Sequence, residues 1–273
     1  MVTTTTTRSE VVSPDGTTIA YHSSGEGPPV LLVHGGLGDH TRWEALRPLL
    51  TSHVTVHAMD RRGRGASGDH PQYQLAREFE DVAAVIDAIA TTSGHPVGVY
   101  GHSFGGTCAF GAAPLTSNIS RLVLYEGWPP VDPAAWAPPE GLLERLEAML
   151  EDGDPERLVE TFLREYVRMT DEQVEAYRQQ PSWPARVAAA HTILREERAF
   201  LATPFDPADA AKVTVPTRLL VGDDQALDWQ PEVVSDAIPD ASVSVLEGQG
   251  HTADITAPDL VADRLLTFVG ARP

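Results

Sequence analysis

One serine of this chain stands where a nucleophile could act. Ser103 lies in Gly101-His102-Ser103-Phe104-Gly105, after the apolar run 96–100 and before the small-residue run 107–113. Gly-x-Ser-x-Gly between a strand and a helix is a nucleophile elbow, a turn so tight that the flanking residues must be nearly free of side chains. The pattern therefore predicts that the Ser103 hydroxyl projects above a sheet edge. The alternative is a glycine-rich turn without chemistry.

A serine hydroxyl is a weak nucleophile at neutral pH and needs an adjacent base. His251 follows the last predicted strand, 242–246, on a loop flanked by glycine. Because sites in open α/β sheets lie beyond the carboxyl ends of the strands, His251 is expected to reach Ser103. It would act first as general base and then as general acid. The alternative is an exposed loop histidine.

A carboxylate must orient the histidine and stabilise its charged form. Asp223 and Asp224 follow the strand before that of His251, which gives the chain order serine, aspartate, histidine expected for such a triad. Asp224 is preferred because it lies further beyond the strand end. Asp223 and Glu126, which also follows a predicted strand, stay open as alternative acids.

An oxyanion hole needs two backbone N–H groups aimed at the developing negative charge. One is expected from Phe104, the residue after the nucleophile. The other is assigned to Gly36 in His34-Gly35-Gly36, which follows the apolar run 30–33. The residues expected to line the pocket are His34, His102 and Trp128, with Trp136, Trp183 and Phe200 as further aromatic candidates. The alternatives are a structural role for the two histidines and, for the aromatic residues, packing between the core and the helical insertion.

The loop Asp60-Arg61-Arg62-Gly63-Arg64-Gly65-Ala66-Ser67 places three arginines among glycines. No Gly-Lys-Ser/Thr sequence follows it, so it is not a P-loop for phosphate. We expect a structural loop that braces the site, with Asp60 paired to an arginine. The histidines and acidic residues show no metal-ligand spacing, so neither a metal nor a cofactor is predicted.

Strand and helix patterns alternate around these residues. Two short runs, 10–13 and 17–22, are typical of a hairpin because Pro14-Asp15-Gly16 separates them. Buried parallel strands read as continuous apolar runs, and these occur at 30–33, 54–59, 96–100, 121–125, 217–221 and 242–246. Helices are predicted at 41–50, 73–91, 107–115, 231–238 and 258–269. The alternation predicts a mainly parallel sheet with right-handed crossovers.

The strand pattern stops in one long stretch. Helical patterns occupy 142–150, 155–169, 171–179 and 184–200, and prolines, glycines and aspartates separate them. We therefore divide the chain into a first core part, 1–130, a helical cap, 131–212, and a second core part, 213–273.

Composition narrows the class of protein. The 273 residues suit one large α/β domain with an insertion. The net charge of −19 argues against nucleic acid or an anionic membrane as a partner and leaves a small-molecule substrate. The single cysteine, Cys108, excludes an internal disulfide. The N-terminal threonine run lacks the apolar segment of a signal peptide, so a cytoplasmic protein is expected. The oligomeric state stays open.

Together the motifs resemble the α/β-hydrolase fold family. The resemblance rests on the His-Gly-Gly loop, the Asp60–Ser67 loop, the serine elbow and Gly248-Gln249-Gly250-His251. It implies an eight-stranded, mainly parallel α/β sheet flanked by helices, with a helical cap inserted after the sixth strand. The arginine loop is similar to that of the branch with esterases, lactonases, cofactor-free haloperoxidases and C–C bond hydrolases. One departure is the acid loop, Gly222-Asp223-Asp224-Gln225, which lacks the usual proline after the aspartate.

These features predict a serine hydrolase that cleaves a small, apolar carboxylic ester, thioester or lactone through an acyl-enzyme on Ser103. Relatives that open epoxides or cleave carbon–halogen bonds resemble one another in using an aspartate nucleophile, and the serine argues against both. A non-hydrolytic protein, such as a biosynthetic cyclase or a ligand-binding protein, is the alternative from another class. An acyltransferase that uses the same pocket is the third.

Overall fold

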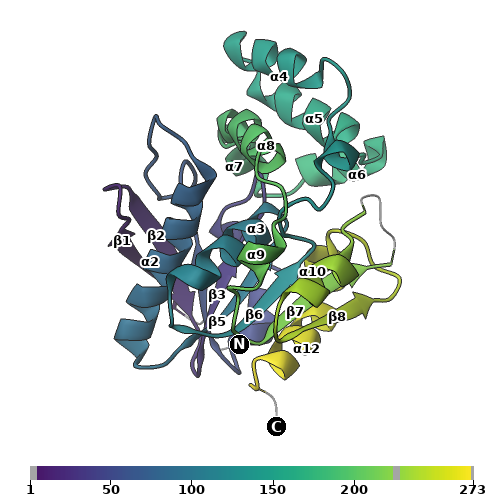
Figure 1. Ribbon diagram of the computed structural model, residues 1–273. Helices are drawn as coiled ribbons and strands as arrows, with labels where there is room; N and C mark the ends of the chain where they lie inside the picture. The colour runs from purple at the N-terminus through teal and green to yellow at the C-terminus, as the bar shows by residue number, and fades with distance from the viewer. Residues whose placement is uncertain (1–4, 224–227, 272–273) are drawn as a thin grey trace.

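The central sheet forms from eight strands within residues 5–223 and 228–271, the parts of the chain that the computed structural model describes (Figure 1). Their order across the sheet is β1-β2-β4-β3-β5-β6-β7-β8. The strands are β1 (Thr7–Val12), β2 (Thr18–Ser24), β3 (Pro29–Val33), β4 (Thr55–Met59), β5 (Val97–His102), β6 (Ile119–Tyr125), β7 (Thr217–Gly222) and β8 (Ala241–Leu246). Strand β2 pairs antiparallel with β1 and β4, and the other pairs are parallel. The mainly parallel eight-stranded sheet is confirmed.

The middle strands are buried on both faces because their sequences are continuous apolar runs. All five residues of β3 are buried. Leu31 and Val33 enter one core, while Val30 and Leu32 enter a second core on the opposite face. Since successive side chains of a strand point to opposite faces, one uninterrupted apolar strand serves both cores. Cys108 is fully buried in the first of them.

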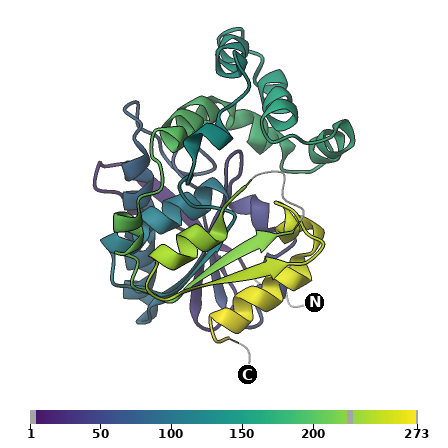
Figure 2. The same ribbon diagram turned by 45° about the vertical axis from the view of Figure 1, so that its right-hand side comes forward.

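Helices cover both faces of the sheet. The first core packs beneath α2 (Leu75–Ser93), α3 (Phe104–Ala112) and α10 (Pro231–Ala237). The second packs beneath α1 (Arg47–Leu50) and α12 (Pro258–Phe268). Figure 2 shows α10 and α12 on opposite sides of β7 and β8. No helix in these described parts has the length and apolar character needed to cross a membrane.

The helix expected over 41–50 is broken in two. A 3₁₀ turn, η1 (His40–Trp43), is followed by α1, which has Pro48 in its first turn. Proline has no N–H to donate to the preceding turn, so it begins a new helix more readily than it continues one. Asp39 accepts the Thr41 N–H at 2.8 Å and caps η1.

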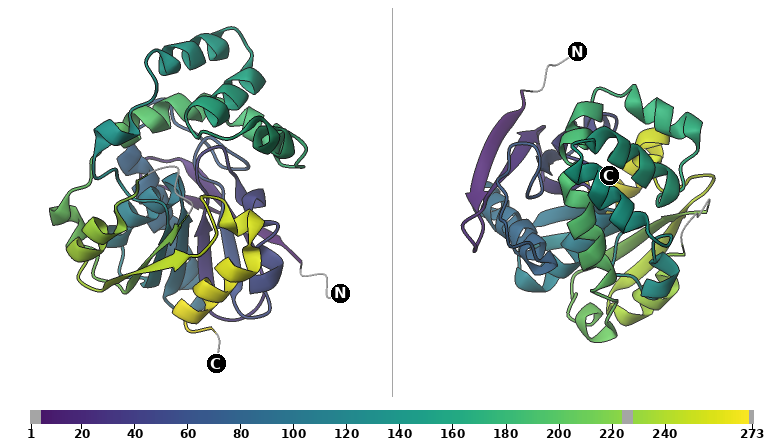
Figure 3. Two further views of the ribbon diagram at one scale, coloured as in Figure 1. Left: turned by 90° about the vertical axis from the view of Figure 1, so that its right-hand side faces the viewer. Right: turned by 90° about the horizontal axis from the view of Figure 1, so that it is seen from above.

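Residues 131–212 contain helices and no strand, and all of them lie in the described part of the chain. The elements are η3 (Pro133–Trp136), α4 (Leu142–Glu151), α5 (Pro155–Glu165), α6 (Asp171–Arg178), α7 (Trp183–Ala188), η4 (Ala190–Thr192), α8 (Ile193–Leu201) and α9 (Pro207–Ala210). Helices α4 to α8, called the cap helices below, gather above one edge of the sheet (Figure 3). They share an apolar core that includes Leu146, Val159 and Ile193.

Candidate active site

Ser103 occupies the tight turn between β5 and α3. Its φ is 54°, a left-handed value that a residue with a side chain rarely adopts. A Cβ atom on Gly105 would lie 2.3 Å from carbonyl oxygens at the end of β3, and one on Gly101 would lie 2.6 Å from the Gly106 Cα atom. Both glycines are therefore required by close packing, which is the physical content of the elbow pattern.

His251 lies on the loop after β8 and is held by contacts around its ring. Its Nδ1 atom lies 2.6 Å from Glu126 Oε2. The Trp229 ring stacks on the imidazole with centroids 5.9 Å apart and an interplanar angle of 11°. The backbone is fixed as well, because His102 Nε2 donates to the His251 carbonyl oxygen at 2.7 Å. With Nδ1 directed at a carboxylate, Nε2 is the nitrogen left to serve Ser103.

Ser103 and His251 line one cavity. In the described residues no hydrogen bond within 3.5 Å joins the serine hydroxyl to the imidazole. Catalytic hydrogen bonds are often long without substrate and shorten in the substrate complex. The arrangement thus places the candidate nucleophile and the candidate base at one cavity.

The carboxylate beside His251 belongs to Glu126, one of the two alternative acids. Glu126 follows β6, is 2% exposed, and accepts the Gly222 N–H at 2.8 Å through its second oxygen. Asp223 is exposed and accepts the Gly248 N–H at 2.7 Å instead. Asp224, the preferred acid, lies outside the described residues. Among the described candidates, only Glu126 contacts the histidine.

The two expected oxyanion donors border the same cavity. Gly36 and Phe104 both line it. Within the described chain, neither N–H donates a hydrogen bond to another residue, so both are available to a ligand oxygen. Gly35 must be glycine, because a Cβ atom there would lie 2.8 Å from Ser103 Cβ. At Gly36 the nearest atom to such a Cβ would be Glu196 Oε2 at 3.9 Å, so this position faces open space.

Residues of the core and of the cap helices together form the cavity wall. His102, Trp136 and Phe200 line it, as expected. It also contains residues that were not predicted, among them Arg42, Phe162, Tyr166, Tyr177, Arg186, Glu197 and Trp229. These come from separate segments with no shared motif, so only folding brings them together.

Three predicted lining residues lie behind the cavity wall. His34 is fully buried, and its ring bridges the Gly35 carbonyl at 2.8 Å and the Arg61 N–H at 3.1 Å. Trp128 is 1% exposed and donates its indole N–H to the Trp229 carbonyl at 2.8 Å. Trp183 packs in the core of the cap helices. The expected place in the pocket lining is not observed for these three side chains, which serve internal packing and hydrogen bonding, the alternative role that the sequence left open.

Arg61 connects the loop His34-Gly35-Gly36 to the cap helices. Its guanidinium donates to the Gly35 carbonyl at 3.2 Å, to Glu78 at 2.7 and 3.0 Å, and to Glu196 of α8 at 2.8 Å. Arg64 also binds Glu196. Burial alone would lower the pKa of Arg61, but the two carboxylates outweigh it and raise that pKa well above its usual value. The Asp60–Ser67 loop therefore braces the site through Arg61, as expected.

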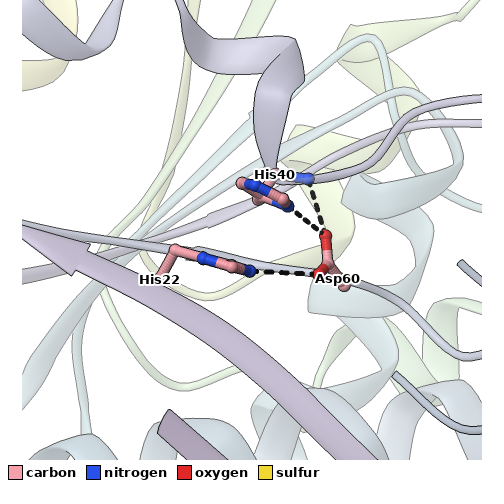
Figure 4. A group of neighbouring side chains, drawn as sticks. All are labelled: His22, His40 and Asp60. Atoms are coloured by element: carbon pink, nitrogen blue, oxygen red, sulfur yellow. Dashed lines mark hydrogen bonds and ion pairs between the residues drawn. The ribbon is translucent and has the colours of Figure 1, made fainter. Parts of the chain in front are cut away.

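The expected pairing of Asp60 with an arginine is wrong. Asp60 Oδ1 accepts the N–H and the ring Nδ1–H of His40 at 2.8 and 2.7 Å, and Oδ2 lies 3.2 Å from His22 Nε2 (Figure 4). The two imidazole rings stack with centroids 3.6 Å apart. The arginines that follow Asp60 find acidic partners elsewhere; Arg62, for example, binds Asp81.

Among the described residues, His22, His40 and Asp60 form the cluster that could hold a metal ion, because their possible ligand atoms all lie within 4.8 Å of one another. Each of the two imidazoles already has a hydrogen bond to the carboxylate. Burial and the neighbouring His40 lower the pKa of His22, whereas the Asp60 carboxylate outweighs burial and raises that of His40. The cluster comes from three separate segments, which is why sequence spacing did not reveal it.

Comparisons with known proteins agree with this architecture. A sequence model of the alpha/beta hydrolase family matches residues 30–264. The 2-hydroxy-6-oxo-6-(2'-aminophenyl)hexa-2,4-dienoic acid hydrolase of Metapseudomonas resinovorans is 26% identical over 96% of this chain and 90% of its own length. The crystal structure of an alpha/beta hydrolase from Sphaerobacter thermophilus has a TM-score of 0.80 and 36% identity, covering 95% of this chain and 99% of that one. An esterase from Thermogutta terrifontis has a TM-score of 0.75 and 25% identity, with coverage of 97% and 98%.

Proposed function

The chain belongs to the alpha/beta hydrolase family, and we propose that it is a serine hydrolase acting on carboxylic esters, thioesters or lactones. The observation that carries the proposal is the Glu126–His251 contact of 2.6 Å beside the cavity that also holds Ser103. A buried carboxylate fixes the tautomer and orientation of an imidazole that serves as a base. A ligand-binding protein has no need of such a pair next to a half-buried elbow serine at the cavity.

The proposed reaction follows from these positions. Ser103 Oγ attacks the carbonyl carbon while His251 Nε2 takes the hydroxyl proton. The Gly36 and Phe104 N–H groups stabilise the negative oxygen of the tetrahedral intermediate. His251 then returns the proton to the departing alkoxide or thiolate, which leaves an acyl-serine. Water, deprotonated by His251, attacks that ester and releases the carboxylic acid.

Glu126 is our proposed acid of the triad. It reaches His251 from the end of β6, and the Gly222 N–H fixes its other oxygen. A hydrogen-bonded carboxylate of this kind stabilises the imidazolium that forms in the transition state. This assignment takes Glu126, the alternative acid that contacts His251, in place of Asp224, which lies outside the described residues.

The aromatic wall of the cavity suits a substrate with an apolar acyl or alcohol group. The rings of Trp136 and Phe200 pack edge to face with centroids 5.5 Å apart, and the centroids of Trp136 and Trp229 are 4.4 Å apart. These aromatic rings therefore form a continuous surface of the cavity. Such surfaces favour apolar ligands. We also propose that residues 131–212 act as a cap that sets substrate choice. The similarity to an esterase at 25% identity is consistent with ester cleavage.

The test is covalent labelling with a fluorophosphonate, followed by intact mass spectrometry. The wild-type protein should gain one adduct, Ser103→Ala none, and His251→Ala an adduct that forms much more slowly. Loss of a true nucleophile lowers turnover by about 10⁴- to 10⁶-fold, so ester hydrolysis by Ser103→Ala should be close to background. Full labelling or wild-type turnover in Ser103→Ala would refute the proposal.

A further inference from the structure

One buried guanidinium in the cavity wall has no carboxylate partner. Arg186, on α7, is 5% exposed and lines the cavity of Ser103. In the described chain its contacts are a long hydrogen bond of 3.4 Å to Gln180 and a cation–π contact with Tyr177, at 4.6 Å from the ring centre. Its Nε atom is buried and has no hydrogen-bond partner.

The other arginines around the cavity are neutralised. Arg42 makes a bidentate ion pair with Asp254, with distances of 2.7 and 2.8 Å. Arg61 and Arg64 share Glu196, and Arg61 also binds Glu78. The carboxylates of Asp254 and Glu196 therefore already have cationic partners. Arg186 is the exception, because no carboxylate oxygen of the described chain lies within 4.0 Å of it.

Burying a charge without an ionic partner has an unfavourable free energy, and binding of an anion reduces that free energy. Burial lowers the pKa of Arg186 to about 10, so the side chain remains charged at neutral pH. A guanidinium keeps its N–H donors in its own plane, where they match the two oxygens of a carboxylate. With a net charge of −19, the whole chain does not attract anions. The positive charge is therefore a local property of this cavity.

We propose that Arg186 binds a carboxylate of the substrate, remote from the carbonyl that Ser103 attacks. The substrate class is thus an ester, thioester or lactone that carries a second, ionised carboxyl group. The statement that the substrate is an ester, thioester or lactone rests on the proposed hydrolase function. Binding of the carboxylate by Arg186 does not depend on that function. The aromatic wall then contacts the apolar part of the substrate between its two ends.

The test compares two esters of equal length. Mono-p-nitrophenyl adipate carries a terminal carboxylate, and p-nitrophenyl hexanoate has a methyl group in its place. Arg186→Gln should lower kcat/KM for the adipate ester by about 10- to 100-fold and that for hexanoate by less than about 3-fold. Arg186→Lys should recover part of the adipate activity. Arg198→Gln is the matched control, since Arg198 is exposed on α8 and paired with Glu147, and it should change neither ester.

A binding measurement separates this inference from the hydrolase proposal. Free adipate should bind Ser103→Ala in calorimetry, and the double variant with Arg186→Gln should lose that binding. Adipate binding without any ester hydrolysis would refute the hydrolase and leave the carboxylate site standing. Equal loss on both esters, or adipate binding that survives Arg186→Gln, would refute the carboxylate site. If Arg186→Gln does not fold, as judged by circular dichroism, Arg186→Met replaces it, because it keeps the apolar stem.

Discussion

Glu126 Oε2 lies 2.6 Å from His251 Nδ1, although the two residues are 125 positions apart in the chain. The other carboxylate oxygen accepts the N–H of Gly222 at the end of β7, so one side chain connects β6, β7 and the histidine loop. Glu126 has a φ of 41°, unusual for a residue with a side chain. Such conformations persist where the surroundings fix them, and they concentrate at functional sites.

The first prediction concerns this carboxylate. Glu126→Gln should lower kcat for p-nitrophenyl acetate by about 10³- to 10⁴-fold, because an amide in that place favours the wrong imidazole tautomer. The fold should persist, since glutamine has the same shape and can still accept the Gly222 N–H. Steady-state kinetics at neutral pH, with circular dichroism as a check on folding, measure both expectations.

Two aspartates give matched controls for that variant. Asp223→Asn makes the same chemical change at an exposed residue and should alter kcat by less than about 3-fold. Asp224→Asn should also be mild if Glu126 is the acid. A large loss in Asp224→Asn together with a mild Glu126→Gln would contradict the assignment.

The candidate serine and histidine could be identified from the sequence, whereas the choice among the three candidate acids, Asp224, Asp223 and Glu126, could not. A tight turn admits few residue types, so Gly101 and Gly105 mark the elbow in the sequence itself. A triad carboxylate has no such local constraint, and any acidic residue at a neighbouring strand end is a candidate. Which of them reaches His251 depends on loop conformation, here the left-handed backbone at Glu126, and no sequence pattern encodes that.

Two neighbouring glycines should respond differently to the same substitution. In Gly35→Ala the new Cβ would lie 2.8 Å from Ser103 Cβ, so either Ser103 or the loop that holds Gly35 must move. A displacement near 1 Å costs about 10²-fold in rate, and Gly35→Ala should lose at least that much kcat/KM. Gly36→Ala keeps its N–H and meets nothing closer than 3.9 Å, so it should retain most activity. Similar losses of kcat/KM in the two variants would show that the loop holding Gly35 and Gly36 is not packed against Ser103.

The buried ion pairs of Arg61 predict a large effect on stability. Arg61→Met would leave Glu78 buried without its charged partner, and breaking such a pair costs about 3–5 kcal/mol in the free energy of unfolding. Arg164→Met is the matched control, because Arg164 forms its ion pairs at the surface and should cost less than about 1 kcal/mol. Urea denaturation of both variants measures the difference. Equal shifts would mean that the Arg61 network contributes no more than a surface pair.

The arginine loop shows where reasoning from sequence neighbours ends. Asp60 stands beside Arg61 and Arg62, and the expected pairing followed from that adjacency. Consecutive side chains point in different directions, so Asp60 reaches His22 and His40, while the partners of Arg61 come from α2 and α8. Strands and most helices were predictable because apolar periodicity is local. Partners from separate segments, here between 17 and 135 residues apart, were not.

The final prediction is a pH dependence that originates in Glu197 of α8. Its Oε2 atom is buried and has no hydrogen-bond partner in the described chain, and the residue lines the cavity. Burial raises the pKa of this carboxyl from 4.5 to about 8. Between these two values the unfolded chain releases the proton while the folded protein keeps it. The contribution of Glu197 to stability therefore falls as the pH rises through this window.

Glu197→Gln removes that titration, so the variant should be more stable than the wild type at pH 8 by about 1–2 kcal/mol, a rise in Tm of about 2–6 °C. The two proteins should melt at nearly the same temperature at pH 4, where the carboxyl is protonated in both states. Glu151→Gln, at an exposed position at the end of α4, should give no pH-dependent difference. Thermal melts of the three proteins from pH 4 to 9 make the comparison. A Glu197→Gln melting curve that tracks the wild type at every pH would show that burial does not raise the pKa of the Glu197 carboxyl.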